Sequence, residues 1–141
     1  ESCTGGLVAS LLTDLAGASN FFRGAVVAYD NAVKAGALGV SPALLPTKGA
    51  VSAEVARAMA EGVRRALGTD VALGVTGIAG PDGGTPTKPV GLVHFAVATV
   101  EGTTDRSIVW PGNRQHVRLF AAYTGLSLVR RVVLHGHGGD H

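Results

Sequence analysis

An apolar run of eight residues, DVALGVTG at 70–77, constrains the fold most. A run of this length with few polar side chains is typical of a β-strand that is buried on both faces. A loop of fourteen residues rich in glycine and proline, 78–91, follows it directly. A loop of that length is uncommon inside a compact domain and usually serves a site. We therefore expect a sheet covered on both faces, with a site near the end of this strand.

The remaining elements alternate along the chain. Helical spacing of apolar residues predicts helices, and β-branched and aromatic runs predict strands. The predicted helices cover 4–15, 30–38, 53–67 and 113–134, and the predicted strands cover 21–29, 70–77, 92–99 and 104–110. Ser52 is a suitable N-cap for the third helix, Gly68 ends it, and Pro42 and Pro46 predict a loop before it. This order predicts an α/β fold, a layered domain with a mixed sheet covered by helices.

The start of the chain suggests a missing element. In an α/β layer, a helix that opens on S-x-T-G-G usually follows a strand, because the turn hangs from the carboxyl end of that strand. The chain begins at Glu1, with no residues for such a strand. We therefore expect a parent protein to supply the first strand, so that this chain is a fragment.

Composition limits the classes of function. The chain of 141 residues fits one domain, which we place at 1–134. Apolar residues make up 46% and charged residues 16%, so another subunit or an absent segment is expected to cover part of the surface. The net charge is +2 and the basic residues form no stripe, which makes nucleic acid an unlikely partner. No apolar run approaches the ~20 residues of a membrane span, so we expect a soluble protein.

Metal and disulfide chemistry find little support. The single cysteine excludes an internal disulfide and a four-cysteine zinc site. The tail HGHGGDH, 135–141, is rich in histidine, but its pattern favours a disordered end over a metal site. We expect no metal and no cofactor.

The opening ESCTGG allows two interpretations. A thiol at the first turn of a helix gains thiolate character, so Cys3 could be a nucleophile, although no histidine can be placed beside it from the sequence. Alternatively, Gly5 lets the backbone approach a ligand closely, and the free N–H groups of a first turn favour an anion. In that case Ser2, Thr4 and Gly5 form part of a phosphate cradle or of an oxyanion hole. We favour the cradle.

Five stretches in order carry a resemblance to a known family: ESCTGG at 1–6, GASNFFRGAVVAYDNAVKAGALGV at 17–40, GAVSAEVARAMAEG at 49–62, VTGIAGPDGGTPTKPVG at 75–91 and PGNR at 111–114. Together they resemble the CinA C-terminal domain, the nicotinamide mononucleotide deamidase family. The resemblance covers 1–134. It implies a metal-independent amidohydrolase that converts nicotinamide mononucleotide to nicotinic acid mononucleotide and ammonia. It also implies a cytoplasmic bacterial protein, a homo-oligomer, and a second domain fused upstream.

The resemblance also implies site residues. The family's catalytic serine matches Ser19, its lysine matches Lys34, its tyrosine matches Tyr29, and its arginine after the PG turn matches Arg114. A lysine acts as a base only when its pKa is lowered. Lys34 is the lysine most suited to this, because it follows an apolar run while Lys48 and Lys88 lie in or beside loops.

Each of these assignments has a structural alternative. Ser19 could cap a turn and Lys34 could be a solvated surface residue. Tyr29 could bond to either of them, stack on a pyridine ring, or simply end a strand. At the end of the buried strand, Thr76 and Gly77 occupy the place where open α/β sheets bind ligands, yet they could also form a plain turn. Arg114 suits a phosphate or a carboxylate, or could be a surface charge.

Two positions depart from the family pattern. Ala28 stands where a serine is common before the tyrosine, and Asn113 stands where an aspartate is common before the arginine. Loss of that carboxylate could loosen the orientation of Arg114. Two other functions compete with the deamidase: hydrolysis of a different small amide, and a noncatalytic module of a competence- or damage-inducible protein that binds nucleotides or another domain.

Overall fold

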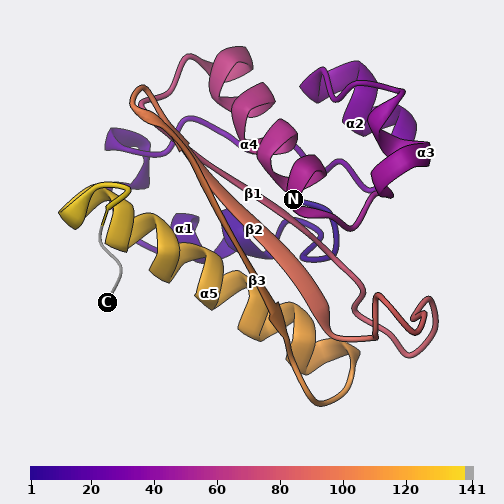
Figure 1. Cartoon of the computed structure of the whole chain (residues 1–141). Helices are drawn as coiled ribbons and strands as arrows, with labels where there is room; N and C mark the ends of the chain where they lie inside the picture. Colours follow the sequence, from indigo (N-terminus) through magenta and orange to yellow (C-terminus); the bar gives the residue numbers. More distant parts are fainter. Residues whose placement is uncertain (139–141) are drawn as a thin grey trace.

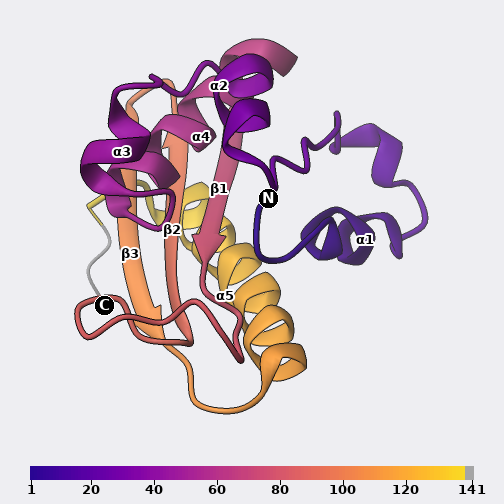
Figure 2. The ribbon, with the colours of Figure 1, turned by 90° about the vertical axis from the view of Figure 1, so that its right-hand side faces the viewer.

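The structure is a computed structural model that describes residues 1–138. Its elements follow the chain in the order α1 (Leu7–Thr13), a 3-10 turn η1 (Ala18–Asn20), α2 (Asn31–Leu38), α3 (Leu44–Lys48), α4 (Ala53–Leu67), β1 (Val71–Gly77), β2 (Leu92–Thr99), β3 (Gly102–Val109) and α5 (Arg114–His135). The three strands form one antiparallel sheet in the order β1-β2-β3. Helix α4 covers one face and α5 the other, with α1 beside α5 (Figures 1 and 2). The predicted layered α/β fold is confirmed, but the three strands of the described residues pair antiparallel and do not form the mixed sheet that the sequence predicted.

Helix α4 forms where the sequence predicts it. The Ser52 hydroxyl accepts a hydrogen bond from Val55 N at 3.2 Å and so satisfies one free donor of the first turn. Gly68 ends the helix with φ +62°, a conformation that glycine adopts without strain. The buried face of the helix packs on β1 and β2.

Small residues bring α4 unusually close to the sheet. Ala56 and Ala60 on the helix and Ala96 and Ala98 on β2 form one buried cluster. Gly74 of β1 lies directly beneath the helix, where a Cβ atom would collide with Ala56 O. This close packing fixes the middle of β1 under α4.

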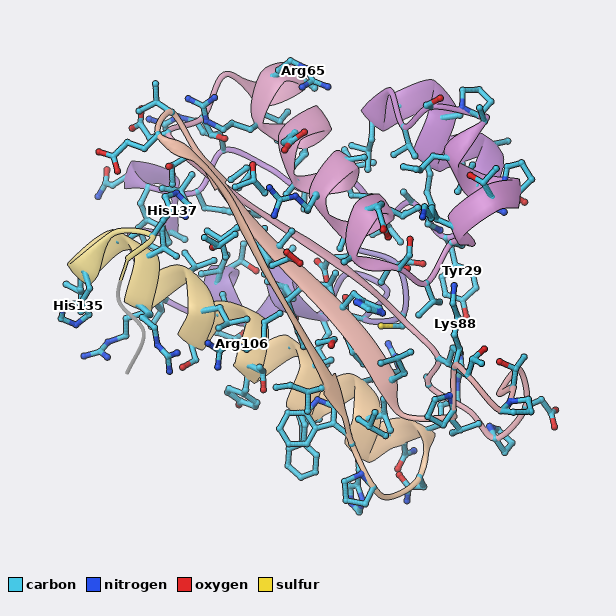
Figure 3. The ribbon with its side chains drawn as sticks, in the orientation of Figure 1. Tyr29, Arg65, Lys88, Arg106, His135 and His137 are labelled. Atoms are coloured by element: carbon cyan, nitrogen blue, oxygen red, sulfur yellow. The ribbon has the colours of Figure 1, made fainter. Side chains whose placement is uncertain are left out.

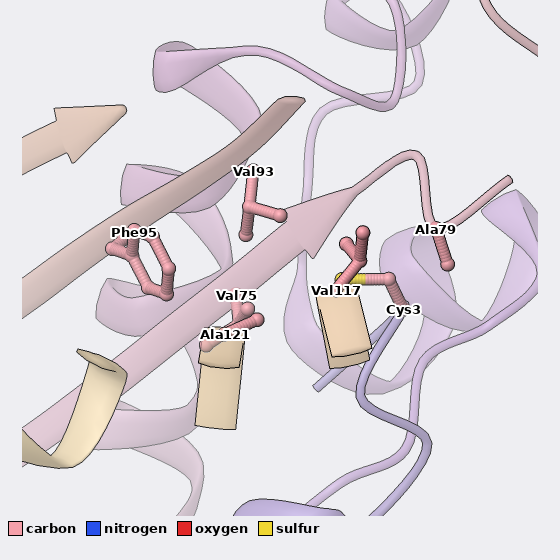
Figure 4. Close-up of a cluster of buried hydrophobic side chains, with 7 residues drawn as sticks. All are labelled: Cys3, Val75, Ala79, Val93, Phe95, Val117 and Ala121. Atoms are coloured by element: carbon pink, nitrogen blue, oxygen red, sulfur yellow. The ribbon is translucent and has the colours of Figure 1, made fainter. Parts of the chain in front are cut away.

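The core on the other face of the sheet includes the start of the chain. Side chains from the strands, from the following loop and from α5 meet Cys3 there (Figure 4): Val75, Ala79, Val93, Phe95, Val117 and Ala121. The opening turn is therefore anchored in the core through Cys3.

Two predicted elements differ in the structure. No strand forms over 21–29: Phe21 belongs to a turn, and 22–29 have no regular secondary structure. A strand needs a partner, and the partner seen here is Glu1, whose nitrogen donates to Val26 O at 2.9 Å and whose carbonyl accepts from Ala28 N at 2.8 Å. The segment between Pro42 and Pro46, predicted as a loop, contains the start of the short helix α3.

The end of the chain is more ordered than predicted. Helix α5 includes His135, and the ring of His137 lies within hydrogen-bonding distance of Thr99 Oγ1 and Thr104 Oγ1, at 2.6 and 3.2 Å (Figure 3). The boundary predicted at 134 thus lies one residue before the end of α5. Residues 139–141 lie outside the described part. Within 1–138, no group of three acidic, histidine or cysteine side chains could hold a metal ion.

A search of the described helices finds none with the length and hydropathy that a membrane span requires.

The close contact between α4 and β1 leads to a stability test. In the Gly74→Ala variant the new methyl would collide with Ala56 O and lie 2.9 Å from Ala60 N, both backbone atoms that cannot move alone. We expect the free energy of unfolding, measured with urea, to fall by about 1–3 kcal/mol. Gly36→Ala on α2 is the matched control, since nothing lies within 4 Å of the added methyl. That change should raise stability by about 0.5–1 kcal/mol. Equal effects of the two substitutions would contradict this packing.

Candidate active site

The opening turn and helix α2 bring a serine and a lysine together. Ser2 N donates to Val75 O at 3.0 Å, which fixes Ser2 beside β1. Asp30 caps α2 by accepting from Ala32 N at 2.7 Å, and Lys34 follows one turn later. Lys34 Nζ lies 3.2 Å from Ser2 Oγ and donates a hydrogen bond to it. The two residues are only 8% and 1% exposed, so this pair is buried.

The surroundings of Lys34 make its charged form less favourable than it is in water. Besides Ser2 Oγ, its Nζ donates to two backbone carbonyls, Ala28 O at 2.8 Å and Tyr29 O at 3.1 Å. All three partners are uncharged oxygens. Burial lowers the pKa of the Lys34 amine below its ordinary value, although the Asp30 carboxylate partly opposes that shift. A lysine with a lowered pKa can take a proton from a hydroxyl, so the pair can act as nucleophile and base.

Helix α5 holds the backbone of the opening turn. Arg118 Nε donates to Cys3 O at 3.1 Å, and Arg118 Nη2 donates to Thr4 O at 3.1 Å. Our sequence reasoning missed Arg118. The sequence did contain one indication of Arg118. It lies one helical turn after Arg114, so the two arginines share a face of α5.

Thr4 and Gly5 differ in what they offer a ligand. Thr4 is fully buried, and its hydroxyl has no hydrogen-bond partner, which is uncommon for a buried polar group. Gly5 is exposed and adopts φ +60°, but its N–H already donates to Ser2 O at 2.9 Å. The Gly5 amide thus serves the turn itself, and the free donor is the Thr4 hydroxyl.

Cys3 sits next to the pair but faces the core. Its side chain packs among the apolar residues of Figure 4. Burial raises the pKa of the Cys3 thiol to about 11, so the thiol stays protonated near neutral pH. This environment is that of a small apolar side chain and not that of a nucleophile.

Arg114 and Tyr29 meet at the edge of the site. Arg114 Nη2 donates to the Tyr29 hydroxyl at 3.1 Å, and Arg114 Nη1 donates to Gly80 O at 2.8 Å in the loop after β1. Figure 3 shows Tyr29 at the end of the sheet where this loop leaves β1. Asn113 accepts from His116 N at 2.9 Å and caps α5. Asparagine caps a helix as well as aspartate does, and Arg114 is held by its own two bonds.

Thr76 and Gly77 serve the architecture at the end of β1. Thr76 is buried, and its hydroxyl donates to Ala50 O at 2.8 Å, which holds the segment before α4. At Gly77 a Cβ atom would lie 2.8 Å from Leu92 O, so the neighbouring strand requires glycine there.

Ser19 lies away from the lysine. It belongs to the exposed turn η1, where its carbonyl accepts from Arg23 Nη1 at 3.3 Å. Figure 2 shows α1, which precedes this turn, standing out from the sheet on the side away from α2. The structure therefore does not bring Ser19 to Lys34, and Ser2 occupies the place expected for it. The sequence alone could not show which serine contacts Lys34. Both serines are distant from Lys34 along the chain, so the tertiary structure decides which one lies beside it.

Known proteins resemble this chain in sequence. A CinA-like protein of Anaeromyxobacter dehalogenans is 57% identical over 130 residues, which are 92% of this chain and 32% of that protein. A CinA-like protein of Geobacter sulfurreducens is 52% identical over 134 residues, 95% of this chain and 32% of that protein. The chain thus spans about a third of the length of these relatives.

Solved structures agree with the fold. The competence/damage-inducible protein CihA of Agrobacterium tumefaciens matches with a TM-score of 0.91 at 40% identity, over 94% of this chain and 81% of that one. The competence damage-inducible protein A (ComA) of Klebsiella pneumoniae matches with a TM-score of 0.91 at 30% identity, over 95% and 83%. The family model of the CinA C-terminal domain matches residues 1–133. The chain therefore belongs to the CinA C-terminal domain family.

Proposed function

We propose that this domain is an amidohydrolase that converts nicotinamide mononucleotide to nicotinic acid mononucleotide and ammonia. Ser2 is the nucleophile and Lys34 is its base. The observation that supports this most is the buried contact of 3.2 Å between Ser2 Oγ and Lys34 Nζ, at a lysine whose pKa burial lowers. The substrate follows from the resemblance to the deamidase family, and the residue types fit hydrolysis of a carboxamide.

The proposed reaction conserves atoms and protons. Neutral Lys34 takes the hydroxyl proton of Ser2, and Ser2 Oγ forms a bond to the carboxamide carbon. Lys34 then gives that proton to the amide nitrogen, the C–N bond breaks, and ammonia leaves an ester on Ser2. Water attacks the ester while Lys34 accepts one of its protons and returns it to Ser2 Oγ, which releases the carboxylic acid; the acid then loses its proton to solvent. The hydroxyl of Thr4 is the donor we assign to the oxyanion, because it is buried without a partner.

Arg114 is the residue to which we assign the phosphate of the substrate. It stands in the first turn of α5, a helix of 22 residues, where free N–H groups favour an anion. Two of its five donors bond to Gly80 O and Tyr29 OH, which fix the plane of the guanidinium. The remaining donors can bind phosphate oxygens. Tyr29, whose side chain is exposed beside it, would then border the ribose phosphate or the pyridine ring.

The proposal departs from the sequence prediction in its nucleophile. Ser19 is exposed and is not among the partners of Lys34 Nζ, whereas Ser2 is buried and bonded to it. Cys3 lies beside Ser2 in the chain but stays protonated in the core. Ser2 is therefore the hydroxyl with an adjacent base.

Substitution of the pair tests the assignment directly. We expect Ser2→Ala and Lys34→Met each to lower kcat by about 10²–10⁴-fold, because each removes a group that acts in the transition state. Ser19→Ala should keep kcat within about twofold. Ammonia release from nicotinamide mononucleotide is the measurement, with circular dichroism to confirm that each variant folds.

The same assay separates the competing functions. Full activity in Ser2→Ala, or loss of activity in Ser19→Ala alone, would overturn the assignment of the nucleophile. Faster turnover of nicotinamide without the ribose phosphate would instead favour another small amide as substrate. Tight binding of the mononucleotide by the wild type with no ammonia released would favour a noncatalytic module.

The pKa of Lys34 predicts a pH dependence. The reaction needs the neutral amine, whose fraction rises with pH, so kcat/KM should increase with pH through the lowered pKa of Lys34. The Asp30 carboxylate raises that pKa. In Asp30→Asn the helix cap is kept and the charge is lost, so the pKa should fall and the rising limb should move to lower pH.

The control for this measurement is Asp70→Asn, at the start of β1 and at the opposite end of that strand from the site. Its pH profile should match the wild type. A rising limb that stays in place or moves to higher pH in Asp30→Asn would show that a group other than Lys34 sets it.

The buried thiol gives a further prediction. Because burial raises the pKa of Cys3 to about 11, iodoacetamide at neutral pH should alkylate the native protein far more slowly than the urea-unfolded protein. Mass spectrometry measures both rates. We also expect Cys3→Ala to keep more than about a tenth of the wild-type kcat, since the thiol takes no part in the reaction. Rapid alkylation of the native protein that abolishes activity would contradict the assignment.

A further inference from the structure

The loop between β1 and β2, 78–91, folds against itself around Val90. Two glycines of the loop pack on this side chain and its backbone. At Gly80 a Cβ atom would lie 2.5 Å from Val90 Cγ1, and at Gly84 it would lie 2.9 Å from Val90 N. The two ends of the loop are therefore packed together, so that Gly80 and Val90 hold fixed places relative to each other.

A tight turn in this loop presents the side chain of Lys88. Thr85 N donates to Lys88 O at 2.8 Å, and Lys88 N donates to Thr85 Oγ1 at 3.0 Å, so the two ends of the turn are bonded to each other. The side chain leaves the turn and reaches the end of α3, where Lys88 Nζ donates to Lys48 O at 2.6 Å. The last carbonyls of a helix lack partners within the helix, and lysine is a common donor to them. Lys88 thus ties the loop to α3.

The end of α3 leaves room for this amine. Gly49 follows the helix with φ +80°, and a Cβ atom there would lie 2.8 Å from Lys88 Nζ. Lys88 is half-buried. The side chain of Lys48 is instead exposed, and its amine lies 4.0 Å from Glu54 Oε1. The two lysines therefore differ in what they do for the loop, because Lys88 contributes its amine and Lys48 contributes only its carbonyl.

The second anchor of the loop lies at the proposed phosphate site. Within the part of the chain that the structure describes, 79–88 make two hydrogen bonds to the rest of the molecule. One is the bond from Lys88, and the other joins Arg114 Nη1 to Gly80 O at 2.8 Å. Figure 3 shows Lys88 at the same end of the sheet as Tyr29, the other partner of Arg114. The bond from Lys88 and the bond to Arg114 thus fix the same short segment.

We propose that Lys88 is a positioning residue: by holding the loop on the end of α3, it places Gly80 O so that Arg114 is oriented for the phosphate of the substrate. This role rests on the proposed function, in which Arg114 takes that phosphate. Without the bond from Lys88 the loop has more freedom, and Arg114 loses a fixed partner. Binding of the phosphate must then also order the loop, which lowers the affinity.

Binding of nicotinic acid mononucleotide tests this role, because this product of the proposed reaction carries the phosphate and is not consumed. We expect Lys88→Met to raise its Kd, measured by isothermal titration calorimetry, by about fivefold or more. Lys88→Arg, which keeps a donor, should recover part of that loss. Nicotinic acid riboside lacks the phosphate, so its Kd should be the same for Lys88→Met and for the wild type.

The matched control is Lys48→Met. It removes a positive charge from the same end of α3 but keeps the carbonyl that Lys88 contacts. Its Kd for the mononucleotide should stay within about twofold of the wild type, because an exposed ion pair contributes little. Equal Kd values for Lys88→Met and Lys48→Met would overturn the proposal.

A double-mutant cycle separates positioning from direct contact with the ligand. If Lys88 acts through Arg114, Lys88→Met should cause no further rise in Kd in an Arg114→Gln background. The full loss in that background would show that the Lys88 amine itself contacts the ligand, and the positioning role would be wrong.

Amide hydrogen exchange, measured by NMR, tests the bond to α3 without any ligand. In Lys88→Met the amide of Thr85 should exchange about tenfold faster. The amide of Gly91, which donates to Ile78 O at 2.8 Å at the base of the loop, should keep its rate. Unchanged exchange at Thr85 would contradict the proposal.

The ammonia assay of the wild type distinguishes failure of this role from failure of the proposed reaction. Ammonia release together with an unaltered Kd in Lys88→Met would overturn the role of Lys88 alone. A wild type that releases no ammonia, with the expected Kd differences present, would overturn the reaction and support the role of Lys88.

Discussion

The buried hydrogen bond between Ser2 and Lys34 is the interaction on which the rest of this site depends. An ammonium group removed from water is costly, and here its partners are a hydroxyl and two backbone carbonyls, without a carboxylate in contact. Burial therefore makes the charged amine less stable than it is in water, which lowers its pKa. Burial of the amine would only destabilise the fold if Lys34 were a structural residue. The lowered pKa that burial causes is what a general base requires. Burial thus links the packing of α2 to the chemistry of the opening turn.

Three elements distant in sequence hold this pair in place. Strand β1 accepts the Ser2 N–H through Val75 O, and the close contact of α4 at Gly74 fixes that strand. Helix α5 donates from Arg118 to the carbonyls of the next two residues of the turn. The Ser2 hydroxyl and the Lys34 amine are therefore held in contact by helices and a strand and not by a flexible loop. Arg114, four residues earlier on α5, places a positive charge at the edge of the same site, so one helix orients both the turn and the proposed phosphate contact.

The sequence predicted the parts of the molecule that local patterns determine. Helix α4 was correct from its Ser52 cap to Gly68, because the cap, the spacing of four and the terminal glycine are all local signals. Lys34 was recognised as the lysine suited to burial for a similar reason. The pairing of Ser2 with it was missed, since it joins positions 32 residues apart through β1. The strand predicted over 21–29 did not form. Its residue types suit a strand, but a strand forms only beside a hydrogen-bonded partner.

The proposed reaction requires Ser2 to carry the acyl group during turnover. Its most direct measurement is mass-spectrometric peptide mapping after the protein reacts with an activated ester of nicotinic acid mononucleotide and is quenched in acid. The account predicts a nicotinoyl ribonucleotide adduct on the Ser2 hydroxyl, formed more slowly in Lys34→Met and absent from Ser2→Ala. An adduct on Ser19 or on the Cys3 thiol, retained when Ser2 is replaced, would contradict it.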